Sequence, residues 1–372
     1  MGRPGVHIDP ARFVNKAIDD QVIENFMPEH QFRDFKIDQR LVAAIASKGY
    51  KTPTPIQDKI IPHIIDGLDV VGIADTGSGK TAAFLVPLIN KILQNQREQI
   101  LIVAPTRELA VQIDQEFKSF VRGTRMFSVC CVGGVGIGRQ IQELRYSYSF
   151  IIGTPGRLKD LIERKIIHLS EFNTVVLDEA DRMFDMGFIK DTRFIINGMP
   201  EGRQTLFFSA TISRDIERMI GEFTKNPVRV SVKTRDTSKN VEQDVIKIEQ
   251  GKTKLDVLSN LLHQKDFNKV LVFGRTKHGV EKLSKMLLYK GFMVESIHGN
   301  KNNSQRQRAL SMFKDSRIQV LVATDVAARG LDIADISHVI NYDLPSTYDD
   351  YIHRIGRTGR YNKRGMALTF ID

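Results

Sequence analysis

The acidic stretch at residues 175–181, VVLDEAD, passes directly from three apolar residues into a cluster of carboxylates. The apolar run favours a buried strand, and carboxylates in close contact at its end repel one another unless a cation or a hydrogen-bond donor neutralises them. A solvated turn would explain an isolated acidic pair equally well. The choice between these interpretations depends on what the other strand ends carry.

A glycine-rich stretch at residues 69–81, DVVGIADTGSGKT, lies between an expected strand and an expected helix. Glycine residues let the backbone wrap closely around phosphate oxygens and expose N–H groups at a helix N-terminus. Lys80 would then reach the β- and γ-phosphates of a nucleotide, and the Thr81 hydroxyl would coordinate Mg²⁺. Ala74 stands where the strict G-x-x-x-x-G-K-T pattern has its first glycine, and a Gly-Ser linker is the alternative. A Lys-Thr pair at a helix start favours the phosphate loop, whose expected nucleotide-binding residues are Thr76, Gly77, Ser78, Gly79, Lys80 and Thr81.

This phosphate loop also explains the acidic stretch. A phosphate-bound Mg²⁺ needs hard oxygen ligands from a neighbouring strand end. Asp178 fits as the carboxylate that holds the metal together with Thr81, and Glu179 fits as the base that orients and deprotonates an attacking water. The sequence therefore predicts a nucleotide-hydrolysing site in which Lys80, Asp178 and Glu179 are catalytic.

The elements that must position these residues follow an α/β pattern. Short apolar, β-rich runs alternate with longer amphipathic stretches from Phe32 onward, which favours βαβ units and parallel sheets covered on both faces. Residues 234–240 are polar, have no apolar face and predict a linker. The expected organisation is a flexible basic N-terminal arm at 1–30, one α/β domain at 31–233 and a second at 241–372. Ligands of such sheets bind at the carboxyl ends of the strands.

Composition narrows the function classes. The chain has 372 residues and a formal charge of +10, which suits a polyanionic partner, although many soluble proteins are mildly basic. No apolar run approaches the roughly 20 residues needed to span a bilayer, and the N-terminus lacks the apolar core of a secretory signal. Cys130 and Cys131 are strand neighbours that point to opposite faces, so neither a mutual disulfide nor a cysteine metal site is expected. A cytoplasmic protein is predicted.

The residues Asp178-Glu179-Ala180-Asp181, together with the phosphate loop, closely resemble the signature of the DEAD-box ATP-dependent RNA helicases of superfamily 2, of the bacterial type. The resemblance covers about residues 32–372, with the motifs in the family's order. It implies two tandem RecA-like domains, each a parallel sheet flanked by helices, with ATP and Mg²⁺ as cofactors. It also implies a monomer that binds RNA through sequence-independent backbone contacts. RNA-stimulated ATP hydrolysis would then unwind short duplexes or remodel RNA–protein complexes.

The segment at residues 49–57, GYKTPTPIQ, resembles the part of this family that senses adenine. The resemblance implies that Gln57 reads the adenine edge, that Tyr50 stacks on the base and that Phe32 supports the segment. Thr52 belongs to the same binding set. Without this context, a glutamine after two prolines would be a turn residue.

The stretch Ser209-Ala210-Thr211 resembles the family's coupling motif. Its two hydroxyls are expected to bond the segment at 178–181, including Asp181, and so to link nucleotide state to domain closure. Capping of a strand end is the alternative for such residues.

Three first-domain segments resemble the RNA-facing motifs: PTRELA at 105–110, GG at 133–134 and TPGR at 154–157. Arginine side chains beside glycine backbones and helix starts suit contact with successive phosphates without base readout. Each arginine alone would be interpreted as a solvated surface charge. The expected RNA-binding residues are Arg107, Gly133, Gly134, Thr154, Pro155, Gly156, Arg157 and, in the second domain, Thr324.

Two second-domain segments complete the resemblance. ATDVAARGLD at 323–332 implies contacts with RNA and nucleotide, with Asp332 on the ribose. HRIGRTGR at 353–360 implies a coupling role for His353 and arginine fingers at Arg357 and Arg360, which reach the γ-phosphate only when the domains close. A general basic RNA-binding patch is the alternative.

The sequence departs from the family pattern at two positions. Asn303 replaces a usual glutamine, and Asp75 stands where glutamine or a basic residue is common. Both departures are expected to tune RNA affinity or rate. The resemblance further implies a final helix beyond Asp372. A DNA translocase and an ATP-gated RNA clamp that does not unwind remain the competing functions.

Overall fold

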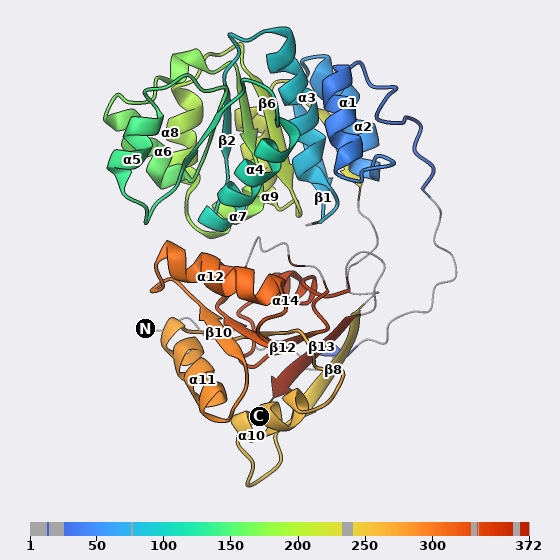
Figure 1. The fold of residues 1–372 in the computed structure, drawn as a ribbon, viewed down its shortest axis with the longest axis vertical. Coiled ribbons are helices and arrows are strands. Elements are labelled where there is room, and N and C mark those ends of the chain that lie inside the picture. Colours follow the sequence, from blue (N-terminus) through green and yellow to red (C-terminus); the bar gives the residue numbers. More distant parts are fainter. Residues whose placement is uncertain are drawn as a thin grey trace. The chain divides into compact units, whose positions relative to one another are not determined.

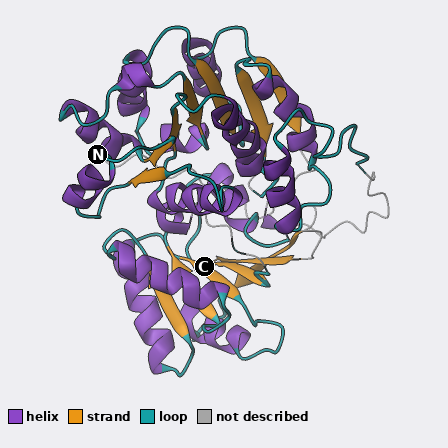
Figure 2. Ribbon diagram, turned by 45° about the horizontal axis from the view of Figure 1, so that its top comes forward, coloured by secondary structure: helices purple, strands orange, loops and turns teal. Residues whose placement is uncertain are grey.

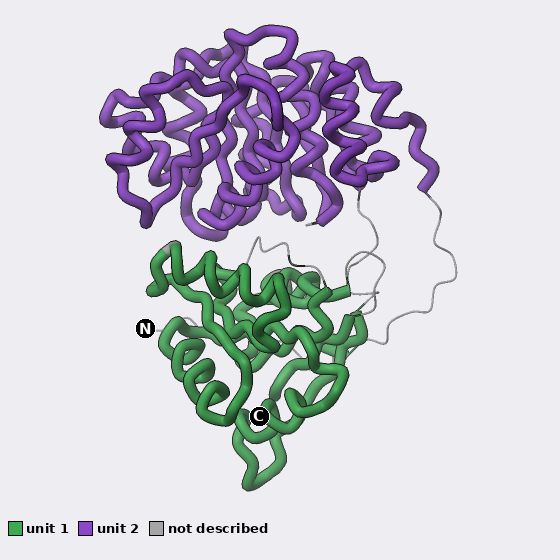
Figure 3. The backbone as a smooth tube through the Cα atoms, viewed as in Figure 1, with its two compact units in different colours: residues 1–23, 235–372 green, residues 24–234 purple. Residues whose placement is uncertain are grey.

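The computed structural model describes residues 13–14, 26–75, 77–232, 241–328, 333, 335–359 and 365–371. The chain divides into two compact units, coloured separately in Figure 3: unit 1 comprises Met1–Ile23 and Arg235–Asp372, and unit 2 comprises Glu24–Thr234. The predicted linker at 234–240 lies outside the described residues. Each unit contains a parallel sheet covered by helices (Figure 2), which confirms the predicted fold class.

Unit 2 has a seven-stranded sheet with the strand order β3-β4-β2-β5-β6-β1-β7, in which every pairing is parallel. The strands are β1 (Val70–Ala74), β2 (Ile100–Val103), β3 (Ser128–Cys131), β4 (Phe150–Gly153), β5 (Thr174–Leu177), β6 (Gln204–Ser209) and β7 (Val228–Val232). The helices are α1 (Gln39–Ser47), α2 (Pro55–Ile65), α3 (Lys80–Gln94), α4 (Arg107–Phe120), α5 (Ile137–Glu143), α6 (Pro155–Glu163), α7 (Ala180–Asp185), α8 (Ile189–Asn197) and α9 (Arg214–Phe223), with a 3-10 turn at Leu169–Glu171.

The central strands of unit 2 are buried along their whole length because helices cover both faces of the sheet (Figure 1). Successive strand residues enter different cores: Val70 packs with α1–α4, and Val71 packs with α5–α9. Cys130 and Cys131 follow the same alternation, and both are free thiols. Their side chains therefore lie on opposite faces of the sheet, as the alternation along a strand predicts.

Unit 1 has a six-stranded sheet, also parallel throughout, with the order β10-β11-β9-β12-β13-β8. Helices α10 and α11 pack on one face, and α12, α13 and α14 pack on the other. The strands are β8 (Val241–Lys247), β9 (Val270–Phe273), β10 (Val294–Ile297), β11 (Val320–Ala323), β12 (His338–Asn341) and β13 (Gly365–Ile371). The helices are α10 (Lys254–Leu262), α11 (Lys277–Tyr289), α12 (Asn303–Lys314), α13 (Asp325–Ala328) and α14 (Tyr348–Ile355).

Within the N-terminal segment at 1–30, the structure describes residues 13–14 and 26–30. The Phe13 side chain is completely buried and belongs to the core of unit 1, next to residues far along the chain. Its neighbour Val14 is 55% exposed. Within the described residues, no helix is both long and apolar enough to cross a membrane.

Candidate functional site

The predicted residues of unit 2 divide into two groups along the carboxyl edge of its sheet. The phosphate loop follows β1, the acidic stretch follows β5 and the Ser-Ala-Thr segment ends β6, and these three strands are consecutive neighbours in the sheet. The three RNA-facing segments follow β2, β3 and β4, which are also consecutive. Because the strands are parallel, both groups lie at one edge, where ligands of such sheets bind.

The phosphate loop is held against the adenine-sensing segment by Gln57. This buried side chain accepts a hydrogen bond from the Thr54 N–H at 2.9 Å and donates to the Gly79 carbonyl at 3.1 Å. Gly79 has a φ of 92°, and a Cβ atom there would lie 2.5 Å from Gln57 Nε2. A glycine is therefore required for the backbone conformation and for the close approach of Gln57.

Polar groups converge inside this loop in a way that fits a phosphate ligand. Lys80, at the first position of α3, is 6% exposed, and its Nζ donates to the Ala74 carbonyl at 2.5 Å. The Ser78 hydroxyl is buried and has no hydrogen-bond partner within the described part of the chain. A buried hydroxyl without a partner is costly, and a phosphate oxygen would satisfy it. Thr81 follows in the first turn of α3, and Thr76 lies outside the described residues.

The acidic stretch is buried where β5 passes into α7. Asp178 is 2% exposed, and its Oδ1 accepts a hydrogen bond from the Glu179 N–H at 3.0 Å. Burial, followed by repulsion from Glu179, raises the pKa of Asp178 well above its ordinary value, while Lys80 acts in the opposite direction. A divalent cation would relieve this cost, so the donor set of Asp178 and the Thr81 hydroxyl fits Mg²⁺.

Glu179 has a partner that the sequence analysis missed. Its backbone is left-handed, with a φ of 53°, and its Oε2 accepts a hydrogen bond from Arg182 Nη1. Arg182 is only 2% exposed. Its position three residues after Glu179, at a helix start, was a usable signal. The pair neutralises one carboxylate of the cluster and fixes the side chain predicted to be the general base.

Asp181 joins the acidic stretch to the Ser-Ala-Thr segment. Its Oδ2 accepts hydrogen bonds from the Ala210 N–H at 3.0 Å, from the Thr211 N–H at 2.9 Å and from the Thr211 hydroxyl at 3.1 Å. The Ser209 hydroxyl instead donates to the Thr211 carbonyl at 2.8 Å, which is the local capping alternative. Thr211 and Ser209 therefore differ: the first contacts the acidic stretch directly, and the second shapes the turn.

The two arginines predicted to contact RNA also make contacts within unit 2. Arg107 lies against the glycine pair, since a Cβ atom on Gly134 would be 2.0 Å from Arg107 Nη1 and one on Gly133 would be 3.2 Å from Nη2. Arg157 Nη1 donates to Gln140 Oε1 at 2.9 Å and to the Val135 carbonyl at 3.2 Å. The remaining predicted residues of this group, Thr154, Pro155 and Gly156, form the N-terminus of α6.

The other residues predicted to bind adenine, Tyr50, Phe32 and Thr52, lie in three different environments. Tyr50 places its hydroxyl 2.9 Å from Glu116 Oε1, where it donates a hydrogen bond, and its ring packs near Phe120. Phe32 is 4% exposed and belongs to the core, and Thr52 is exposed.

A buried carboxylate that the sequence analysis missed ties the start of unit 2 to α2. Asp58 accepts hydrogen bonds from the Glu29 N–H at 2.8 Å and the His30 N–H at 3.1 Å. It thereby anchors the chain just before Phe32.

In unit 1, the second-domain motifs meet at Arg354, another residue missed as a functional candidate. Arg354 is buried and forms two hydrogen bonds with Asp325, at 2.6 and 2.8 Å, which tie α14 to α13. Thr324 directly precedes α13. Arg357 is 3% exposed, and its Nε donates to the His353 carbonyl at 3.2 Å. Asp332 and Arg360 lie outside the described residues.

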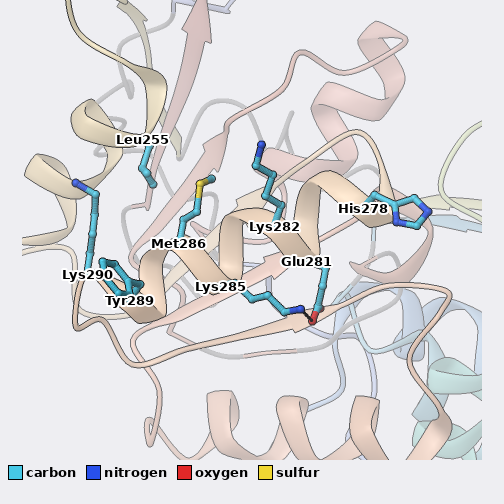
Figure 4. A pocket seen from close by; sticks show the side chains of 8 residues that line it. All are labelled: Leu255, His278, Glu281, Lys282, Lys285, Met286, Tyr289 and Lys290. Atoms are coloured by element: carbon cyan, nitrogen blue, oxygen red, sulfur yellow. Dashed lines mark ion pairs between the residues drawn. The ribbon is translucent and has the colours of Figure 1, made fainter.

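A surface pocket of about 540 Å³ lies on unit 1 beside α10 and α11 (Figure 4). Two of its lysines have carboxylate partners: Lys285 pairs with Glu281 at 3.8 Å, and Lys290 pairs with Asp256 at 3.3 Å. None of its lining residues belongs to the predicted site. They are Leu255, His278, Glu281, Lys282, Lys285, Met286, Tyr289 and Lys290.

Two parallel-sheet units, one with a phosphate loop beside an acidic strand end, define a nucleotide-binding protein of the RecA-like class. The family model described as DEAD/DEAH box helicase matches residues 54–219, and the one described as helicase conserved C-terminal domain matches residues 253–362. The chain belongs to the DEAD-box ATP-dependent RNA helicase family, as the sequence analysis predicted.

Individual relatives agree with this assignment. The sequence is 45% identical over 342 residues to the DEAD-box ATP-dependent RNA helicase CshA of Bacillus subtilis, covering 91% of this chain and 69% of the relative. It is 44% identical over 344 residues to the ATP-dependent RNA helicase CshA of Listeria monocytogenes, covering 92% and 66%. The chain thus spans about two thirds of the length of these relatives.

Solved structures show the same two-domain architecture. The structure of S. cerevisiae Dbp5 bound to RNA and ADP BeF3 matches with a TM-score of 0.82 at 28% identity, covering 92% of this chain and 89% of that one. A DEAD box protein from the hyperthermophile Methanococcus jannaschii matches with a TM-score of 0.53 at 37% identity, covering 92% and 93%. The prediction of two RecA-like domains is confirmed.

Proposed function

We propose that this protein hydrolyses ATP in an RNA-stimulated manner and uses the cycle to unwind short RNA duplexes or to remodel RNA–protein complexes. The observation that carries the proposal is the shared carboxyl edge of unit 2. The phosphate loop, the acidic stretch and the Ser-Ala-Thr segment lie at the ends of three neighbouring strands, and the three segments with the proposed RNA contacts follow the next three strands. The relatives that are named ATP-dependent RNA helicases, and the Dbp5 structure bound to RNA and ADP BeF3, support the same activity.

The proposed roles follow the contacts of each group. Lys80 and the loop amides bind the phosphates, and Thr81 and Asp178 would hold Mg²⁺, which when bound neutralises phosphate charge. Glu179, held by Arg182, orients and deprotonates the attacking water. Asp181 accepts hydrogen bonds from Thr211 and so connects the acidic stretch after β5 to the Ser-Ala-Thr segment at the end of β6.

The proposed organisation extends to the whole chain. Residues 31–233 would form the ATP-binding domain and residues 241–372 the second helicase domain. Arg357 and Arg360 would supply positive charge to the transition state, Asp332 would contact the ribose, and Arg107, Arg157 and Thr324 would contact RNA phosphates. We further infer a cytoplasmic monomer whose RNA contacts are independent of sequence.

The experiment is a measurement of ATP turnover against the concentration of RNA, and of DNA of equal length. The wild-type protein should respond to RNA and not to DNA, which separates the proposed function from a DNA translocase. Glu179→Gln should keep ATP binding and lose turnover by roughly 10²–10⁴-fold, the usual contribution of a general base. Glu143→Gln, which removes an exposed carboxylate paired with Arg139, is the matched control and should leave turnover unchanged. Near-normal turnover in Glu179→Gln would refute the assignment.

A strand-displacement assay in the same conditions decides between unwinding and clamping. Release of a short RNA strand on ATP addition supports unwinding. A long-lived RNA complex without release would assign the protein as an ATP-gated clamp.

A further inference from the structure

The burial of Phe13 is unusual for a residue in a polar N-terminal segment. Its side chain has no exposed surface, although Val14 next to it is 55% exposed. Its ring lies 4.6 Å from the ring of Tyr351, with an interplanar angle of 55°. Tilted aromatic pairs at this distance are favourable beyond the area that they bury. Of the two described residues here, Phe13 is therefore the one inserted into unit 1.

The socket that receives Phe13 is formed by residues far away in the sequence. Tyr351, on α14, has no exposed surface, and Val241, at the start of β8, is equally buried. The Tyr351 hydroxyl lies 2.9 Å from Oε1 of the buried Gln243, also on β8, and the hydrogen bond fixes the ring that Phe13 contacts. Phe13 thus belongs to the core on the face of the sheet that α12, α13 and α14 cover.

We propose that unit 1 carries an aromatic socket whose ligand is the N-terminal segment of the same chain, with Phe13 as the anchor and Tyr351 as the wall of the socket. The occupant is identified by the structure itself, because Phe13 groups with Val241, Tyr351 and Ile355 in one apolar core. The compact unit that contains residues 235–372 also takes in residues 1–23.

The docking has a consequence for α14. The socket supports this helix, which carries His353 and the buried Arg354. Docking of the segment thereby stabilises the element on which the predicted arginine finger Arg357 depends.

The test is limited trypsin digestion of the full chain, with each cleavage site followed by mass spectrometry. The sequence places trypsin sites at Arg12 and Lys16, on either side of the anchor. Cleavage requires a bound segment to leave its site, so the rate at these bonds reports the opening equilibrium. Phe13→Ser should accelerate cleavage there by roughly 10²-fold, the scale expected for loss of a buried aromatic side chain. Val14→Ser changes an exposed neighbour and should leave the rate unchanged.

Further variants keep the test decisive. Phe13→Leu should give an intermediate rate and serves in place of Phe13→Ser if circular dichroism shows that the serine variant does not fold. Tyr351→Phe keeps the ring and should stay protected, whereas Tyr351→Leu should lose protection. Equal cleavage rates in the wild-type, Phe13→Leu and Phe13→Ser proteins would overturn the proposal. Protection that increases with protein concentration, together with a dimer in size-exclusion chromatography, would also overturn it, because the occupant would then be a second copy.

Discussion

The buried pair of Glu179 and Arg182 provides a quantitative test of how the acidic stretch is tolerated. Both side chains are almost completely buried, at 4% and 2% exposure, and Arg182 Nη1 donates to Glu179 Oε2. Replacing Arg182 by Gln leaves the Glu179 carboxylate next to the buried Asp178 without its cation. Breaking a buried ion pair from one side costs about 3–5 kcal/mol.

Two opposing electrostatic effects determine how Glu179→Gln changes the stability of unit 2. Glu179→Gln removes a charge from a cluster in which Asp178 is already destabilised by its neighbour, but it leaves the Arg182 guanidinium without its carboxylate. The double variant, Glu179→Gln with Arg182→Gln, contains neither buried charge of the pair. It should therefore recover much of the loss, with a coupling free energy on the order of 2–3 kcal/mol.

The assay is hydrogen exchange of the β5 and β6 amides in the full chain under native conditions, followed by mass spectrometry. This measurement reports unit 2 separately, which a single global unfolding curve of a two-domain chain does not. Exchange in Arg182→Gln should be faster by about 10²–10⁴-fold, corresponding to the expected free-energy change. A control is Arg193→Gln, which removes an exposed arginine paired with Glu222 and should change exchange by less than about tenfold. Additive effects of the two substitutions at 179 and 182 would refute the reasoning.

Three other predictions follow from the described contacts. Gln57→Ala and Tyr50→Ala should weaken ATP binding and reduce discrimination against GTP, measured as the dissociation constants of both nucleotides. Equal losses of affinity for ATP and GTP would indicate a structural role, which for Gln57 would be its hydrogen bond to Gly79. Arg357→Ala should lower the RNA-stimulated ATP turnover by roughly 10³-fold while leaving ATP affinity unchanged, and a variant with normal stimulation would return Arg357 to a packing role. The buried His338 ring stacks on Phe267, with 3.7 Å between the ring centroids. Burial lowers the pKa of His338 to about 4, and the nearby Asp266 charge acts in the opposite direction. Its neutral form is favoured in the folded state, so unit 1 should keep its full stability above about pH 6.5 and lose on the order of 3 kcal/mol as the pH falls toward 4. His338→Phe should flatten this dependence in hydrogen exchange of β12, and an unchanged profile would contradict it.

The pattern of short apolar runs is clear in the central strands of both sheets and weak in two of the edge strands, β7 and β8. β5 and β9 read as continuous apolar runs because both of their faces are covered. β7, VRVSV, and β8, VEQDVIK, each occupy one end of a sheet and have alternating or polar sequences. A strand with an exposed edge needs less apolar surface, so its periodicity is weak and its assignment depends on the neighbouring strand.

The same division applies to the site. The phosphate loop and the acidic stretch were predictable because each is a short contiguous segment whose chemistry is explicit in its residue types. The contact between Gln57 and Gly79 joins residues 22 positions apart, and only the fold brings them together. Phe13 is the extreme case, since nothing in a polar N-terminal segment indicates which distant tyrosine it will meet. A site made of one contiguous segment can be predicted from the sequence. A contact between residues far apart in the sequence requires the fold.

The carboxyl edge of the unit 2 sheet also suggests how its two groups of residues influence each other. β5, which leads to Asp178, pairs with β2 on one side and with β6 on the other. The Asp178 N–H donates to the Val103 carbonyl at 3.0 Å, just before the segment that carries Arg107, and Asp181 holds the turn at Thr211. In a close-packed sheet a displacement of the β5 end is shared by these neighbours, because the cores on both faces leave few voids to absorb it. The proposed nucleotide contacts and the proposed RNA contacts would therefore bias the same small set of hydrogen bonds, which is the physical requirement for coupling between two binding sites.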